Sequence, residues 1–252
     1  MAANKTCVGL GNYQFLIHDN YFYIALFNNL RWLVVALVFP VTLGFLIAYA
    51  MRLRVVFFPG FLRTAVFFPV TMSLIAVGLM FLLLLNPVFG AFDSLLRLVG
   101  LGFLVQEWFG DFRIALYTLA VISGWAFTGL AMIFYYAGLG DVPKETIDAA
   151  RLEGAGHLRM ITRVALPQLR PVTAVVIMLT LFESFKAFDL IAVLTKGAPF
   201  GTTNVLGYLV YMETFWNSRF GYGATLSVSI LVVSVALAVL LLGTVLRGAF
   251  RE

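Results

Sequence analysis

The chain has 252 residues, of which 62% are hydrophobic and only 12% are charged, whereas a soluble domain carries about 25% charged residues. This composition excludes an ordinary water-soluble domain and indicates an integral membrane protein. The formal net charge of +5 does not indicate nucleic-acid binding, because the basic residues are scattered between apolar runs. Cys7, His18 and His157 are the only cysteine and histidines, so we expect neither an internal disulfide nor a metal site.

Five apolar stretches are long enough to cross a bilayer as helices, which requires about 18 or more residues. The stretches are continuous rather than alternating, so they do not indicate a β-barrel. Pro40 and Pro69 fall inside the first two stretches and predict bends there. We therefore expect an all-α fold, a polytopic membrane helix bundle, with spans at 32–51, 64–85, 114–137, 172–194 and 224–246.

Three connecting segments mix apolar and polar residues at helical spacing. They lie at 11–29, 91–101 and 205–215. Such a pattern is typical of short helices that rest at the membrane surface, and we expect them on the outer face.

The distribution of lysine and arginine predicts the orientation in the membrane. Most of these residues lie in the connections 52–63 and 138–171 and in the tail 247–252, which we therefore place in the cytoplasm. This places the C-terminus inside and the N-terminus outside. An external N-terminus without a signal peptide is unusual, so we expect a further helix to precede this chain in the native protein or to come from a partner.

The longest polar connection, 138–171, is expected to form a helix, a tight turn and a second helix. Residues 144–152 are good helix formers up to a break at Gly154, and the second helix is expected to run from about 155 to 166 and to end at Pro167. Small residues gather at the bend, at Ala149, Ala150, Gly154 and Ala155. They leave little side-chain bulk, so the backbone of another protein can approach closely.

The same connection carries a recognisable motif. Asp148-Ala149-Ala150, then Glu153-Gly154-Ala155, then Leu166-Pro167 resemble the pattern Glu-Ala-Ala, two residues, Asp-Gly-Ala, ten residues, Leu-Pro of permease subunits of binding-protein-dependent ABC importers. The similarity extends over nearly the whole chain and looks like the carbohydrate branch, which includes maltose and glycerol-3-phosphate permeases. The other segments that carry it are 8–13, 63–64 with 67–69, 86–87 with Gly90, 184–189 and 220–222.

The resemblance implies an ABC importer permease fold, in which 1–252 is a single transmembrane permease domain and 138–171 is the cytoplasmic coupling loop. By this resemblance the ATPase-coupling residues are Asp148, Ala149, Ala150, Glu153, Gly154, Ala155, Leu166 and Pro167. Two positions depart from the family pattern: Asp148 replaces Glu and Glu153 replaces Asp, which would shift any salt bridge to the ATPase. Family members usually begin with one more transmembrane helix, so five spans correspond to the family fold without its first helix.

The resemblance also implies the partners. They are a second permease subunit that forms a heterodimer, two cytoplasmic ATPase subunits, and an extracytoplasmic solute-binding protein, all at the inner (plasma) membrane of a prokaryote. The chain has no phosphate-binding Gly-x-x-x-x-Gly-Lys-Ser/Thr loop. We therefore expect no catalytic residue and no cofactor in this chain, with ATP and magnesium bound by the partner ATPase.

Charged residues inside the fourth stretch indicate a solute path. A charge at this depth costs about 2.5 to 3.5 kcal/mol on insertion scales, so it usually faces a bundle interior or a water-filled route. We expect Glu183, Ser184 and Lys186 to line the path with Ser123 and Phe127, because polar groups and aromatic faces together suit a sugar. Glu183 and Lys186 share a helix face and are equally consistent with a structural ion pair, while Asp189 lies nearer the outer end, where water can reach it.

The residues therefore favour half of the translocation path of an ATP-driven importer for a sugar or sugar-like solute, working by alternating access. Two other functions stay open at this point. One is a secondary transporter or channel subunit, which is disfavoured because no inverted repeat is visible. The other is a structural membrane subunit without a solute path, against which the charges of the fourth stretch argue weakly.

Overall fold

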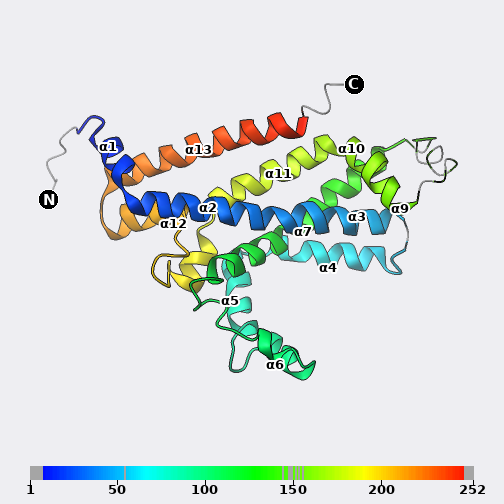
Figure 1. The fold of residues 1–252 in the computed structure, drawn as a ribbon, viewed down its shortest axis with the longest axis horizontal. Helices are drawn as coiled ribbons and strands as arrows, with labels where there is room; N and C mark the ends of the chain where they lie inside the picture. Colours follow the sequence, from blue (N-terminus) through cyan, green and yellow to red (C-terminus); the bar gives the residue numbers. More distant parts are fainter. Residues whose placement is uncertain are drawn as a thin grey trace.

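The computed structural model describes residues 8–53, 55–143, 145–146, 150, 152, 154 and 156–246. The described residues form helices and turns and contain no strand. Figure 1 shows long helices running side by side along the longest axis of the molecule, with α1 and α12 at one end and α9 and α10 at the other. The all-α fold class is therefore confirmed.

The helices follow one another with short connections. Some of them contain π-helical turns, labelled η1, η3, η4 and η5, and η2 is a short 3₁₀ turn. In chain order they are α1 (Gly11–His18), α2 (Asn20–Val38), η1 (Phe39–Gly44), α3 (Phe45–Arg52), α4 (Pro59–Thr71), α5 (Leu74–Leu84), α6 (Ala91–Leu98), η2 (Gly102–Leu104), α7 (Ala115–Asp141), α9 (His157–Arg159), η3 (Met160–Ala165), α10 (Leu166–Gln168), α11 (Arg170–Phe185), η4 (Ile191–Thr195), α12 (Leu206–Tyr211), η5 (Met212–Trp216) and α13 (Phe220–Leu246).

In the described part of the chain, three helices are long and apolar enough to cross a membrane: Asn20–Arg52, Ala115–Asp141 and Phe220–Thr244. Two further pairs of helices pass this test only when the two members are joined. Each pair is bent at its junction, by 105° between α4 and α5 and by 71° between Met160–Gln168 and α11. The structure thus has up to five spans if each bent pair is one span. The spans predicted at 114–137 and 224–246 match α7 and α13 closely.

The first span differs from its prediction. It begins at Asn20 rather than at residue 32, so 11–29 is not one surface helix but the short α1 followed by the start of this span. The segment 205–215 also differs, because Leu206 and Leu209 of α12 are buried in the core rather than resting on lipid. In contrast, α6 is a short helix with exposed Leu95 and Leu98, as the pattern of 91–101 predicts.

The prolines act differently from one another. Pro40 lies in η1, within the helix that continues from Asn20 to Arg52, so it widens a turn without breaking the span. Pro69 lies inside α4, which ends two residues later at Thr71, and the Ser73 side chain then accepts a hydrogen bond from the Ile75 amide to begin α5. The stretch 64–85 is therefore not one straight span. The helix that contains Pro167 ends one residue after it, at Gln168, close to the predicted end, and a bend of 71° follows.

Helix α7 lies at the centre of the packing and approaches the first span at two small residues. A Cβ on Gly124 would lie 2.9 Å from the carbonyl oxygen of Ala36, and a Cβ on Gly44 would lie 2.9 Å from the Ala131 Cβ. Close backbone approach at small residues is how membrane helices gain contact when lipid is as apolar as their side chains. These contacts fix α2 and α7 as one wall of the bundle.

Candidate functional site

The site begins where the fourth span breaks. Helix α11 ends at Phe185, and Lys186 is its C-terminal cap, with its amide donating to the Phe182 carbonyl at 3.1 Å. Residues 187 and 188 are not helical, and helical turns resume at Asp189. The predicted continuous helix over 172–194 is therefore wrong. After the break, Ala187, Phe188 and Asp189 are half-buried and Leu190 is buried, whereas Lys186 is exposed.

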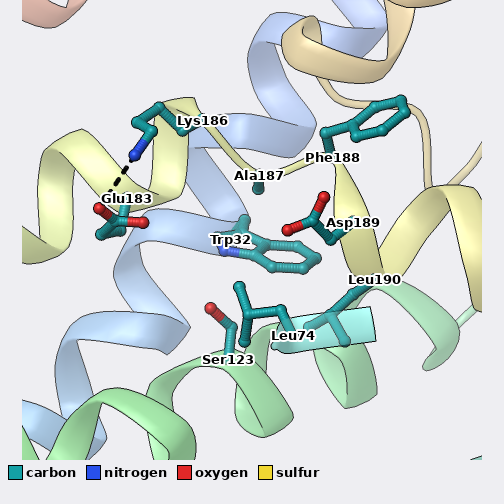
Figure 2. Close-up of a pocket in the computed structure, with 9 residues that line it drawn as sticks. All are labelled: Trp32, Leu74, Ser123, Glu183, Lys186, Ala187, Phe188, Asp189 and Leu190. Atoms are coloured by element: carbon teal, nitrogen blue, oxygen red, sulfur yellow. Dashed lines mark hydrogen bonds and ion pairs between the residues drawn. The ribbon is translucent and has the colours of Figure 1, made fainter. Parts of the chain in front are cut away.

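A cavity of about 80 Å³ lies at this break. Four helices and the break itself supply its walls, and Figure 2 shows the side chains converging, with the Trp32 indole at the centre of the view. The lining residues are Trp32 of α2, Leu74 of α5, Ser123 of α7, Glu183 of α11, and Lys186, Ala187, Phe188, Asp189 and Leu190.

Glu183 and Lys186 form the ion pair that their spacing predicts. The Lys186 Nζ lies 3.3 Å from the Glu183 Oε1, and the two side chains are 72% and 33% exposed respectively. An ion pair this exposed is worth about 0 to 1 kcal/mol in water. It therefore contributes little to holding the fold, and both groups stay available to a third partner.

Three residues complete the polar part of the cavity. Ser123 lies in its lining, as the sequence predicts. Asp189, which the sequence suggested would simply be hydrated, lines the same cavity, and so does Trp32. The Trp32 side chain is only 1% exposed, and its Nε1 has no hydrogen-bond partner among the described residues. The sequence feature that could have indicated Trp32 as a site residue is its position three residues after Asn29 in an otherwise apolar stretch.

Two of the predicted path residues lie elsewhere. Ser184 is buried, and its hydroxyl donates to the Thr180 carbonyl of its own helix at 2.7 Å, so it faces away from the cavity. Phe127 lines a separate apolar cleft of about 10 Å³ with Pro40, Phe134 and other apolar residues. The structure therefore brings together Ser123, Glu183 and Lys186 but not Ser184 or Phe127.

Of the eight predicted coupling residues, four lie outside the described residues: Asp148, Ala149, Glu153 and Ala155. Gly154 lies in a turn with φ of +76°, a left-handed conformation that glycine adopts without steric cost. Ala150 is helical, and Leu166 and Pro167 begin α10. Figure 1 shows α9 and α10 at the same end of the bundle as the connection between α3 and α4, the other basic connection.

The described residues contain no cluster of side chains that could bind a metal ion. Within the described ranges there is no group of three or more His, Cys, Asp or Glu residues. The cavity lining consists of polar and charged groups, two aromatic residues, and the apolar residues Leu74, Ala187 and Leu190.

Comparison with known proteins identifies the family. Residues 40–251 match the family described as binding-protein-dependent transport system inner membrane component. This match covers most of the chain, and the chain belongs to that family. The resemblance inferred from the motif at 148–167 is confirmed.

Similar proteins carry consistent names. The chain is 32% identical over 237 residues to the probable ABC transporter permease protein YurN of Bacillus subtilis (strain 168), covering 94% of this chain and 81% of YurN. It is 30% identical over 249 residues to the arabinooligosaccharides transport system permease protein AraP of the same organism, covering 97% and 77%.

A solved structure shares the fold. A chain in the crystal structure of a bacterial ABC transporter involved in the import of the acidic polysaccharide alginate superposes with a TM-score of 0.79. The match covers 97% of this chain and 85% of that chain at 21% identity. The ABC importer permease fold is thereby confirmed.

Proposed function

We propose that this chain is one of two membrane halves of an ATP-driven importer and that the cavity at the break of the fourth span binds a neutral sugar during transport. The observation that carries the proposal is the convergence of an exposed ion pair, Asp189, Ser123 and the Trp32 indole on one cavity in the bundle. Charged groups at such a position are costly unless they serve a solute or water.

The balance of charge in the cavity favours a neutral solute. Glu183 and Asp189 bring two carboxylates against the single ammonium group of Lys186, which gives a formal charge of −1. This charge opposes a phosphorylated or carboxylated solute. Carboxylate acceptors and an ammonium donor instead suit the hydroxyls of a sugar, and the half-buried Phe188 ring suits the face of a sugar ring. The name of the relative AraP, an arabinooligosaccharides transport system permease, agrees with this class.

The small volume of the cavity supports a partner that completes it. Ligand pockets usually enclose about 300 to 1,000 Å³, whereas this cavity has about 80 Å³ and Lys186 is mostly exposed. In the proposed assembly a second permease subunit provides the facing wall, and an extracytoplasmic binding protein delivers the solute. A neighbouring solved structure, described as the alginate ABC transporter in complex with a periplasmic protein bound to an alginate pentasaccharide, is consistent with such a delivery partner.

The connection 138–171 is proposed to dock on two cytoplasmic ATPase subunits, which bind ATP and magnesium. Their closure would push the two permease halves between inward-open and outward-open arrangements, which is alternating access. The chain itself is then a transport subunit rather than an enzyme, located in the inner membrane of a prokaryote with this connection in the cytoplasm.

The test is solute-stimulated ATP hydrolysis by the complete complex reconstituted into proteoliposomes. Arabinotriose and glycerol 3-phosphate serve as neutral and anionic probes, each delivered by its own binding protein. We expect Glu183→Gln and Lys186→Met to raise the KM for arabinotriose uptake, while Glu107→Gln, which removes an exposed carboxylate outside the cavity, leaves it unchanged. Uptake that is indifferent to both cavity variants would make the ion pair structural, and uptake without the ATPases would favour a secondary transporter.

A further inference from the structure

Two adjacent amide side chains are buried in the first span. Asn28 is 3% exposed and Asn29 is fully buried. A buried amide is costly in free energy unless its donors and acceptor find partners. Both Nδ2 groups and the Asn29 Oδ1 bind backbone groups more than 150 positions away in the sequence, so the pair joins α2 to the second half of the chain.

Asn29 connects two helix ends. Its Nδ2 donates to the Ser184 carbonyl at 2.9 Å, in the last turn of α11, and its Oδ1 accepts from the Leu206 amide at 2.7 Å, at the first residue of α12. The N-cap of α12, Val205, makes no side-chain cap. Backbone groups at helix ends lack partners within their own helix. Here the Asn29 side chain binds the Leu206 amide and shares the Ser184 carbonyl with the Ala187 amide, which donates to it at 3.3 Å.

Asn28 makes a different connection. Its Nδ2 donates to the carbonyls of Thr202 at 3.0 Å and Asn204 at 2.9 Å. Its Oδ1 accepts from Arg31 at 3.3 Å. Asn28 therefore holds the turn that precedes α12, whereas Asn29 holds the end of α11 where the cavity begins.

We propose that Asn29 is a positioning residue for the cavity at the break of the fourth span. The carbonyl that it binds belongs to Ser184, which lies between Glu183 and Lys186 in the sequence, so this bond fixes the last turn that carries the ion pair. Trp32 lies one turn further along the same helix and lines the cavity. Helix α2 thus supplies both the indole in the cavity and the amide that holds the opposite wall.

The consequence for transport rests on the proposed function, but the positioning itself can be measured without any solute. The reporter is Ala187→Cys in a Cys7→Ser background, because Ala187 lies in the break, lines the cavity and carries no charge. The probe is the rate at which a cationic methanethiosulfonate reagent modifies this thiol in the assembled, purified complex. Asn28→Leu is the control, since it removes partly buried amide hydrogen bonds on the same helix that do not reach α11.

We expect Asn29→Leu, which removes both hydrogen bonds at similar side-chain volume, to change the modification rate about fivefold or more. Asn29→Asp keeps an acceptor for the Leu206 amide and should produce a smaller change in the same direction. Asn28→Leu should leave the rate within about twofold. Equal rates in all variants would overturn the proposal, and so would equal changes for Asn28→Leu and Asn29→Leu, because these would indicate general loosening.

Two further measurements, assembly of the complex and the KM for arabinotriose uptake, distinguish a folding role of Asn29 from a positioning role. If neither Asn29 variant assembles while Asn28→Leu does, Asn29 is required for folding and the positioning proposal fails. Where the variants assemble, the KM for arabinotriose uptake should rise in Asn29→Leu with the ATP hydrolysis rate without solute preserved. A changed modification rate with an unchanged KM would support the positioning role and overturn the assignment of this cavity to the solute path.

Discussion

Replacing Gly154 by valine should uncouple ATP hydrolysis from transport. Gly154 has φ of +76° and is exposed, and no described atom lies within 4 Å of a Cβ built on it. Within this chain the cost of a side chain therefore comes from backbone conformation alone. An L-residue in the left-handed region costs about 1 to 2 kcal/mol, and a β-branched residue is especially poorly accommodated there. This cost reduces the population of the observed turn about 5- to 30-fold.

Gly154→Asn is the matched control, because asparagine adds a side chain yet visits the left-handed region readily. Both variants should insert normally, since no span changes. In the reconstituted complex we expect the valine variant to lose sugar-stimulated ATP hydrolysis and co-purification of the ATPases by about 5- to 30-fold. The asparagine variant should stay within about threefold of the parent.

The outcomes distinguish two physical causes. If the asparagine variant fails as severely as the valine variant, the requirement is close approach of the ATPase backbone rather than a positive φ. If the valine variant couples normally, the connection does not transmit force through this turn, and the coupling assignment is refuted.

Three further substitutions test the packing and the loop. Gly124→Leu should lower the melting temperature of the complex, because its Cβ would lie 2.9 Å from the Ala36 carbonyl oxygen in the α2–α7 contact; an unchanged melting curve would contradict this close approach. Trp108→Phe removes the 2.9 Å hydrogen bond to the buried Asp93 carboxylate and should lower the free energy of unfolding by about 1.5 to 3 kcal/mol, measured as a shift in melting temperature. In an Asp93→Asn background, the same Trp108→Phe substitution should cause a much smaller shift. Asp148→Ala should reduce sugar-stimulated ATP hydrolysis less than the valine variant does, because an exposed ion pair at an interface rim is worth about 0 to 1 kcal/mol; an equal loss would place this carboxylate at the centre of the interface.

Local sequence patterns predicted the straight helices well and the broken ones poorly. An apolar window identifies α7 and α13 because their length and composition suffice, whereas the same window joins α4 to α5 and α11 to the residues after it. The bend between α4 and α5 was predicted from Pro69, whereas the break after α11 was not, because the Asn29 amide that binds its last turn comes from a distant part of the chain. The two asparagines also hid the start of the first span, since Asn28 and Asn29 resemble surface residues until their distant partners are known.

The candidate site shows the same division between local and distant information. The Glu183–Lys186 pair was predictable because residues three apart on a helix are neighbours. Ser184 was included as their sequence neighbour, but its hydroxyl bonds to the Thr180 carbonyl. Trp32 and Asp189 reach the cavity only because α2 packs beside the break and because the break redirects the chain after Lys186. The roles of the coupling residues stay predictions.

The open side of the cavity affects how solute preference can change in such a protein. Lys186 is mostly exposed, and the enclosed volume is about 80 Å³, so this chain forms a wall rather than a complete enclosure. If a second polypeptide supplies the facing wall, selectivity is a property of the pair and is inherited through two sequences at once. We expect single substitutions in this wall to adjust the ranking of related sugars, and exchange of the partner half to alter the range of solutes with no change in this chain.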